Sequence, residues 1–340
     1  MSAPCRLALG ALAAALGAAA PAHASDQPFF HNKTITVLVG FSPGGVYDLT
    51  ARALARVLGR HIDGNPSVIV QNKPGAGGAT ALAYLVTAAP QDGTVTGMLK
   101  RSYATDPLFD AAGFQYDATA LHAVGSTSSE VSVAVAWHAA KVQRFEDTYT
   151  TELSVGATSA TDGTVRYANI VSKLTPAKLR IVPGYPGGAE ITLAMERGEV
   201  DAKFGWSWGS VKARAGDWLA AKKINILMQM GMAKAADLPD TPFIMDYAKT
   251  DLDRRALELI FTPTAMAWPL VAAPKVPAER VAILRRAFAA TMQDPQFRAE
   301  AQKLNLDIDP VRGEDMDVIV RRIASYDTAV VERARQLGSQ

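Results

Sequence analysis

The sequence predicts an α/β fold with largely parallel sheets, and two observations carry this prediction. Strand-like and helix-like segments alternate from residue 34 to about residue 230, as they do in proteins built from β-α-β units. Four of the connections from strand to helix are rich in glycine, two in each half of the chain. A length of 340 residues is typical of about two domains, so we expect the four turns to face one cleft from two sides.

The expected elements follow from the spacing of apolar residues. Short apolar runs predict strands at 34–40, 67–71, 94–99, 131–136, 153–157, 179–182, 200–204 and 224–230. Helical spacing predicts helices at 46–60, 77–89, 163–174, 188–197 and 210–221. Two later apolar stripes, at 281–288 and 316–323, predict C-terminal helices that pack back onto the first domain.

The first 24 residues have the pattern of an export signal. Arg6 supplies a positive charge, residues 7–20 form a short apolar core, and Ala22-His23-Ala24 fits a cleavage site. The core is shorter than the roughly 20 residues of a membrane-spanning helix. We therefore expect an exported, soluble and monomeric protein that is cleaved after Ala24.

Composition and charge argue against several classes of function. The formal net charge is +2, and no basic run predicts binding to nucleic acid or to a membrane surface. The only cysteine, Cys5, precedes the apolar core, so no disulfide, thiol nucleophile or lipid anchor is expected. No histidine after the signal has a second His or Cys at ligand spacing, so we expect no metal and no cofactor.

The first glycine turn, Ser42-Pro43-Gly44-Gly45, joins a predicted strand to a predicted helix, and the others lie at 72–78, 156–163 and 183–188. Such turns leave backbone N–H groups at a helix N-terminus, where an anion is stabilised. The phosphate-binding GxxxxGK[ST] pattern is absent, as is GxGxxG with a following acidic residue. A carboxylate therefore fits best, although glycine after a strand also serves turn geometry alone.

At these turns the sequence resembles the extracytoplasmic solute-binding receptors of the tripartite tricarboxylate transporters, the Bug or TctC-like family. The matching stretches are 35–62, with FSPGGVYD, 68–85, with NKPGAGGATALAYL, 184–206, 238–244 and 276–308. The resemblance implies a two-lobed periplasmic-binding-protein fold of type II, a Venus flytrap, in which each lobe is a mostly parallel sheet flanked by helices. We expect lobe 1 at 25–120 plus 250–340 and lobe 2 at 121–249.

The resemblance also implies a function without catalysis. The lobes of such a periplasmic receptor close on a small organic anion, a mono-, di-, tri- or aromatic carboxylate, and the closed form docks on subunits of a membrane permease. Carried over to this sequence, the first lobe's contacts are Ser42, Gly44, Gly45, Gly75, Ala76, Gly77 and Gly78. The second lobe's contacts are Thr158, Ser159 and Gly187, although the ATSATDG stretch departs from the family's serine- and glycine-rich form.

Five further residues are candidates beside the turns. Tyr47, Tyr185 and Trp206 can line the cleft, and their alternative is packing in the surface or core. Arg101 can pair with a distal carboxylate, and its alternative is a solvated surface position. Asp48 fits a first-turn carboxylate that complements the helix dipole better than a contact with an anionic ligand.

Two other functions remain as alternatives. FGWSWGS, at 204–210, matches the GxSxG pattern of a serine esterase around Ser207. All five histidines precede Ser207, whereas an α/β-hydrolase places its catalytic histidine after the serine. The second alternative is a ligand-sensing partner of a signalling kinase, which needs the same closed lobes.

Overall fold

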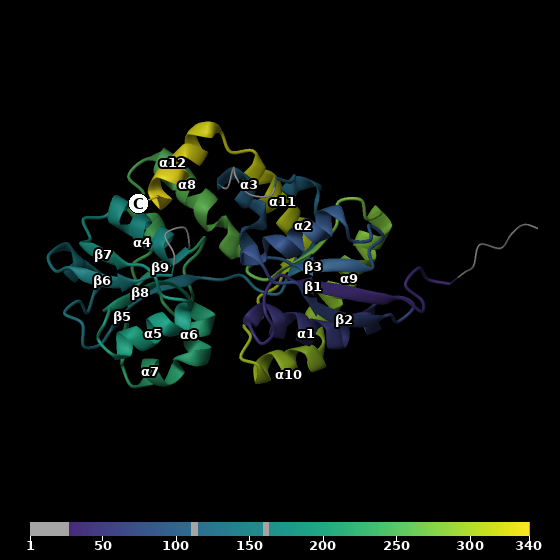
Figure 1. The fold of residues 1–340 in the computed structure, drawn as a ribbon, viewed down its shortest axis with the longest axis horizontal. Coiled ribbons are helices and arrows are strands. Elements are labelled where there is room, and N and C mark those ends of the chain that lie inside the picture. The colour runs from purple at the N-terminus through teal and green to yellow at the C-terminus, as the bar shows by residue number, and fades with distance from the viewer. Residues whose placement is uncertain (1–26, 110–114, 159–162, 340) are drawn as a thin grey trace, which may run out of the picture.

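The computed structural model describes residues 27–109, 115–158 and 163–339, and its strands form two separate sheets. Figure 1 shows one sheet in each half of the molecule, with helices packed around both. The export signal expected at 1–24 lies outside the described residues, as does Ser159. The expected α/β fold with two sheets is confirmed.

The first sheet has six strands in the order β11-β4-β10-β3-β1-β2. These are β1 (Thr34–Val39), β2 (Ser67–Asn72), β3 (Val95–Met98), β4 (His122–Ser126), β10 (Pro269–Ala272) and β11 (Val311–Arg312). Strand β1 pairs in parallel with β2 and β3, whereas β10 runs antiparallel between β3 and β4. The sheet is therefore mixed, whereas the sequence predicted a mostly parallel sheet, because the antiparallel strands β4, β10 and β11 were not expected.

The second sheet has five strands in the order β7-β6-β8-β5-β9. These are β5 (Ser132–Trp137), β6 (Leu153–Gly156), β7 (Leu179–Val182), β8 (Ala202–Ser207) and β9 (Ile224–Met230). Strand β6 is parallel to β7 and β8, and β5 is antiparallel to β8 and β9. All eight strands expected from the sequence are present, and β4, β10 and β11 were not expected.

The helices cover both faces of each sheet. They are α1 (Val46–Leu58), α2 (Ala79–Thr87), α3 (Asp106–Phe109), α4 (Gly163–Leu174), α5 (Gly188–Glu196), α6 (Trp208–Arg214), α7 (Gly216–Ala220), α8 (Asp251–Phe261), α9 (Ala278–Gln293), α10 (Pro295–Lys303), α11 (Gly313–Ala324) and α12 (Thr328–Gly338). In the second half, α5, α6 and α7 lie on one face of the sheet and α4 on the other (Figure 1). The helix expected at 210–221 is divided at Ala215 into α6 and α7.

The C-terminal helices divide between the two halves. Helices α9 and α11 pack on β4 of the first sheet, as the apolar stripes predict. Helix α12 instead packs on α4 and α8, beside the second sheet (Figure 1). Its end is fixed by α4, because Lys173 Nζ donates to the Ser339 carbonyl at 2.7 Å and Asn169 Nδ2 to the Gly338 carbonyl at 3.3 Å.

Two stretches of chain connect the sheets. The segment 127–131 runs from β4 to β5, and residues 231–268, including α8, lead from β9 back to β10. They are joined where the Glu130 N–H donates to the Thr264 carbonyl at 2.8 Å. Among the described residues, none of the helices is both long and apolar enough to cross a membrane.

The glycine turns that follow β1 and β2 are in direct contact. A Cβ atom on Gly40 would lie 2.9 Å from the Gly78 Cα, closer than real Cβ atoms approach. Asn72, at the end of β2, strengthens this contact, because its Nδ2 donates to the Phe41 carbonyl at 3.0 Å and to Asp48 Oδ1 at 2.9 Å. The two turns therefore form one rigid unit.

Asp48 stabilises this unit through a buried carboxylate. It accepts hydrogen bonds from the Gly44 N–H at 2.9 Å, from Arg52 Nε at 3.0 Å and from Asn72. Burial alone would raise the pKa of Asp48, but the bonds from Arg52, Gly44 and Asn72 outweigh it and lower the pKa. These contacts agree with the structural role that the sequence favoured for Asp48.

Replacing Gly40 with alanine should separate the two turns. We expect Gly40→Ala to lower the free energy of unfolding by about 1–3 kcal/mol, because the added methyl group meets backbone that cannot move aside. Gly216→Ala is the matched control, since no heavy atom lies within 4 Å of a Cβ added at Gly216. Urea denaturation measures both variants, and equal stabilities would contradict the close contact.

Asp48→Asn should destabilise the protein by about 1–3 kcal/mol at pH 7, because a buried charge-assisted hydrogen-bond network is lost. The pKa of Asp48 is lower in the folded than in the unfolded state, so its contribution is complete above pH 4 or so and decreases as the pH falls further. The difference in the free energy of unfolding between wild type and Asp48→Asn should therefore become smaller below about pH 4. Asp240→Asn, at an exposed position, is the control, and a pH-independent difference would contradict this account.

Candidate functional site

The first glycine turn presents backbone groups to solvent. Ser42, Gly44 and Gly45 are exposed, and Gly44 has a φ of +86°, which favours glycine. Gly45 is the N-cap of α1, and no side chain caps this helix. The N–H groups of the first turn of α1 are therefore placed to receive an anion.

The second turn has an unusual backbone. Gly75, Ala76, Gly77 and Gly78 all have positive φ values, +139°, +44°, +60° and +96°. Only glycine adopts this region freely, so the left-handed conformation of Ala76 is a strained exception. Gly75, Ala76 and Gly77 are exposed, and Gly78 is buried beneath the Phe41 ring. Strain of this kind, at the start of a helix, is typical of sites that bind ligands.

Tyr47 and Arg101 meet beside the first turn. The Arg101 N–H donates to the Tyr47 hydroxyl at 3.2 Å, and burial raises the pKa of Tyr47 to about 12. The Tyr47 ring stacks on Phe41, with centroids 4.3 Å apart, and contacts Trp268 edge-on at 4.7 Å. Tyr47 is therefore fixed between other rings.

Arg101 is engaged in an ion pair across the molecule. Its guanidinium group donates to the Glu130 carboxylate, which lies on the segment that connects the sheets. The Arg101 side chain is 28% exposed and the Glu130 side chain only 7%. Arg101 is therefore partly buried in an ion pair and does not occupy the solvated surface position that was its alternative.

The turns of the second half also pair with each other. The Gly184 N–H donates to the Thr158 carbonyl at 2.8 Å, and the Tyr185 N–H to the Ala157 carbonyl at 3.2 Å. Gly187 is the N-cap of α5 and, like α1, this helix has no side-chain cap. The turns after β6 and β7 are thus brought together, as those after β1 and β2 are.

The sequence analysis missed a lysine close to these turns. Lys203, on β8, is only 6% exposed, and its Nζ donates to the Gly188 carbonyl at 3.0 Å. The same ammonium lies 4.2 Å from the centroid of the Trp206 ring, a cation–π contact that places Trp206 in the packed layer beneath α5. A lysine inside a predicted strand is the pattern that could have drawn attention to it.

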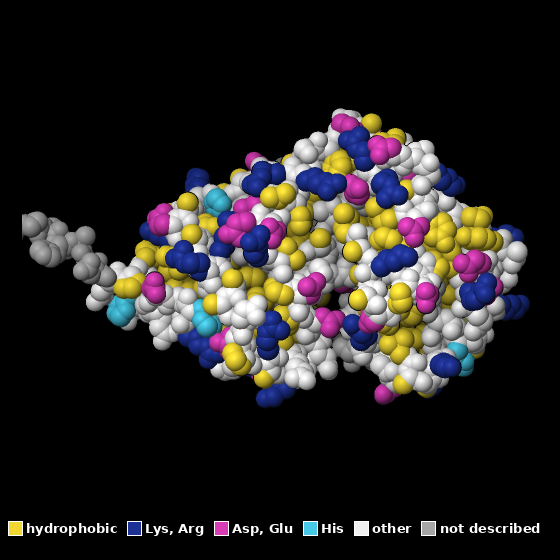
Figure 2. Space-filling model, turned by 180° about the vertical axis from the view of Figure 1, so that it is seen from behind, with side chains coloured by type: hydrophobic (Ala, Val, Ile, Leu, Met, Phe, Trp, Pro, Cys, Tyr) yellow, Lys and Arg dark blue, Asp and Glu magenta, His cyan; other side chains and the backbone are white. Residues whose placement is uncertain are grey.

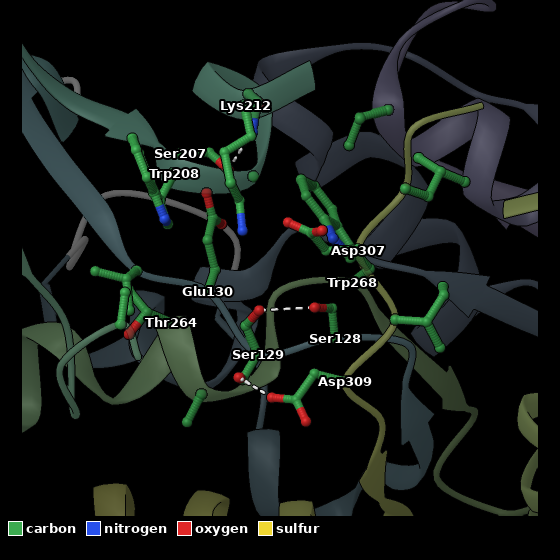
Figure 3. Close-up of a pocket in the computed structure, with 18 of the residues that line it drawn as sticks. Ser128, Ser129, Glu130, Ser207, Trp208, Lys212, Thr264, Trp268, Asp307 and Asp309 are labelled. Carbon is green, nitrogen blue, oxygen red and sulfur yellow. Dashed lines mark hydrogen bonds between the residues drawn. The ribbon is translucent and has the colours of Figure 1, made fainter. Parts of the chain in front are cut away.

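A cavity of about 820 Å³ lies between the two halves, and Figure 2 shows a hollow there. Its walls are the connecting segment 128–131, the start of α6, the loops 232–237 and 304–309, residues before β10, and Val46 and Leu49 of α1. In Figure 3, Trp208 and Trp268 flank Glu130, one from each half. This size is typical of sites for small organic molecules.

None of the predicted contact residues that the structure describes is among those that line this cavity. Two of them touch its wall, because Tyr47 packs on Trp268 and Arg101 pairs with Glu130. The first turn ends at Gly45, next to the lining residue Val46. The cavity therefore begins next to the first turn, and the assignment of the ligand contacts stays a prediction.

The charged lining of the cavity is acidic on balance. It contains four carboxylates, Glu130, Asp237, Asp307 and Asp309, and two lysines, Lys212 and Lys234.

Several of these groups are paired. Asp237 accepts from the Trp208 indole at 2.8 Å and from Lys212 at 3.3 Å, and these partners lower its pKa although burial opposes them. Asp309 accepts from the Ser129 hydroxyl at 2.5 Å (Figure 3).

Ser207 has a structural partner. It is the N-cap of α6, and its hydroxyl accepts from the Ser210 N–H at 3.3 Å. Its φ of −54° is relaxed, unlike the strained serine of a nucleophile elbow. No histidine is among the residues that line the cavity around it. Within the described ranges, no group of three His, Cys, Asp or Glu side chains could hold a metal ion.

Solved structures resemble this chain over most of its length. A TctC solute-binding protein from Polaromonas has a TM-score of 0.68 and 18% identity, covering 88% of this chain and 98% of its own. The periplasmic binding protein BugD has a TM-score of 0.62 and 16% identity, covering 91% and 98%. An R. palustris protein with adipate has a TM-score of 0.64 and 19% identity, covering 89% and 97%.

Curated sequences match over a shorter region. A UPF0065 protein of Bordetella pertussis is 39% identical over 82 residues, 24% of this chain and 24% of the relative. A UPF0065 protein of Cupriavidus necator is 37% identical over 90 residues, 26% of this chain and 27% of the relative. The chain thus matches about a quarter of the length of these relatives, and no protein-family model matches it.

These similarities test the resemblance to the Bug or TctC-like receptors that the glycine turns suggested. The TctC and BugD structures are those of binding proteins, and BugD is described as periplasmic. The resemblance is therefore confirmed: this chain has the two-lobed fold of the TctC and Bug periplasmic binding proteins and shares sequence with UPF0065 proteins.

Proposed function

We propose that this protein is an extracytoplasmic receptor that captures a small organic carboxylate between two lobes and delivers it to a tripartite tricarboxylate-type permease. The observation that carries the proposal is the uncapped N-terminus of α1 beside the cavity between the two halves. Helix α5, in the other half, also begins without a side-chain cap. The neighbour with adipate supports a carboxylate ligand. Each lobe would be built around one sheet. Because β4 (His122–Ser126) belongs to the first sheet, lobe 2 would begin in the connecting segment 127–131, a few residues after the expected boundary at residue 121.

Binding would begin at the paired turns of the first half. Backbone N–H groups of Gly45 to Tyr47 and of Gly75 to Gly77 are the proposed donors to the carboxylate, because the N–H groups of Gly44 and Gly78 already donate to Asp48 and to the Gly75 carbonyl. One helix terminus contributes about 0.3–1 kcal/mol when exposed and up to ~2 kcal/mol when partly buried. Micromolar affinity needs about 8 kcal/mol, so several hydrogen bonds and apolar contacts must act together.

Closure of the lobes would supply these further contacts. The proposed partners for the other end of the ligand are Thr158, Ser159, Tyr185, Gly187 and Trp206. Closing the cleft removes water from the carboxylate, which strengthens each hydrogen bond to it. No reaction is required, and the capping role of Ser207 fits a binding protein.

The proposed location is the periplasm. BugD is described as a periplasmic binding protein, and residues 1–24 have the pattern of an export signal. N-terminal sequencing of the exported protein should find Ser25 first, and an uncleaved chain in the cytoplasm would contradict this location.

A carboxylate should raise the melting temperature. Ligand at 100 times its Kd adds about 2.7 kcal/mol of stability, a shift of several degrees for a protein of this size. Differential scanning fluorimetry with millimolar hexanoate, benzoate, adipate, malate and citrate tests this. If none of them shifts the transition, the carboxylate assignment is wrong.

Gly45→Val should weaken carboxylate binding by roughly tenfold or more, because a branched side chain covers the N–H groups of α1, worth up to about 2 kcal/mol. The fold should survive, since the nearest heavy atom to a Cβ at Gly45 is 3.8 Å away. Gly216→Val, at an open position in the other half, is the control. Calorimetry decides, and unchanged affinity would remove the first turn from the site.

The partner should be found by affinity capture from membranes with and without carboxylate. We expect permease subunits to be enriched when ligand is present, because only the closed form would present both lobes to them. Enrichment of a sensor kinase instead would favour the signalling alternative, and capture independent of ligand would contradict docking of the closed form.

A further inference from the structure

We infer that the ligand is a singly charged carboxylate with an uncharged, apolar tail, and that this tail lies in the cavity between Trp208 and Trp268. The inference rests on the proposed function and narrows its ligand class. Three features of the cavity carry it: the charge of its lining, the pairing of Arg101 and the two tryptophan walls.

The first feature is the charge that a ligand meets inside the cavity. Four carboxylates and two lysines line it, so the formal charge of the lining is negative. Lys212 lies 3.3 Å from Asp237 and Lys234 lies 3.8 Å from Asp246, so both lysines have acidic partners. A second carboxylate on the ligand would be repelled by the remaining acidic groups, and the low dielectric between closed lobes would strengthen that repulsion.

The second feature is that Arg101 already binds an anion. This arginine is the residue that the sequence offered for a distal carboxylate, and its guanidinium group pairs with Glu130. Because the Glu130 side chain is only 7% exposed, a ligand carboxylate that replaced it at Arg101 would leave a buried carboxylate without its partner, which is costly. Glu130 thus occupies the position that a second ligand carboxylate would need, and it selects against dicarboxylates.

The third feature is the pair of aromatic walls. The Trp208 indole N–H is bonded to Asp237 at 2.8 Å, and Trp268 is held edge-on by Tyr47 at 4.7 Å. Their rings are therefore fixed in place before any ligand arrives, as in sites that bind apolar groups. Leu49 and Met232 add aliphatic surface to the same cavity.

The cavity is also continuous with the proposed carboxylate position. Val46 and Leu49, in the first turn of α1, line it, and Gly45 immediately precedes them. A ligand whose carboxylate meets the N-terminus of α1 can therefore extend its tail along these side chains toward the tryptophans.

Two matched pairs of probes test the charge. Hexanoate and adipate share a six-carbon chain and differ in one carboxylate, as do benzoate and terephthalate on one ring. Calorimetry with the mature protein should show the monocarboxylate of at least one pair binding roughly tenfold more tightly than its dicarboxylate. A dicarboxylate that binds as tightly as its partner would overturn the inference and leave the proposed function intact.

The variant Glu130→Gln tests whether Glu130 causes the preference for monocarboxylates. Glutamine keeps an oxygen for Arg101 but loses the charge, so the preference for monocarboxylates should fall severalfold, mainly because adipate binds more tightly. Glu300→Gln is the matched control, since Glu300 pairs with Arg56 away from the cavity. An unchanged preference in Glu130→Gln would overturn the role of Glu130, and the wild-type comparison stands even if this variant does not fold.

Trp208→Leu tests where the tail lies. Benzoate and hexanoate should bind this variant severalfold more weakly. The control variant Trp218→Leu loses a ring that contacts Trp137 edge-on outside the cavity, and it should bind both probes normally. Equal effects of the two variants would place the tail elsewhere. If none of the four probes binds but malate or citrate does, this inference fails and the proposed function stands; if no carboxylate binds, both fail.

Discussion

The close approach of Gly40 to Gly78 is the constraint on which the rest of the proposed site depends. It brings the turns after β1 and β2 into contact, so that both can act on a single anion. The buried carboxylate of Asp48 and the amide of Asn72 hold them there. Because Asp48 needs its hydrogen-bond partners to stay buried and charged, the local charge and the turn geometry depend on each other.

Charge and backbone geometry also depend on each other in the cavity, whose walls come from both halves of the chain. Glu130 lies on the connecting segment, and its backbone N–H is bonded to Thr264 at 2.8 Å. Its side chain pairs with Arg101 from the first half. A movement of one half relative to the other would therefore shift the Glu130 carboxylate within the cavity, so the proposed closure and the proposed selection of the ligand would depend on the same residue.

Periodicity predicted eight of the strands and most helices, because each is specified by residues close together in sequence. It missed β4, β10, which begins with Pro269, and β11, which has only two residues. The glycine turns were found because left-handed backbone selects glycine. The sequence did not predict the ion pair between Arg101 and Glu130, and it did not predict the cavity. Both are formed by segments that lie far apart in the sequence, and no local pattern shows how such segments are arranged.

The position of α12 has a consequence for the order in which the protein can fold. The helix is the last in the chain, yet it packs on α4 and α8 and covers their apolar faces beside the second sheet. Until residues 328–338 have been synthesised, those faces stay open to water. The second half therefore completes its core only after α12 has joined α4 and α8, although most of that half is synthesised much earlier.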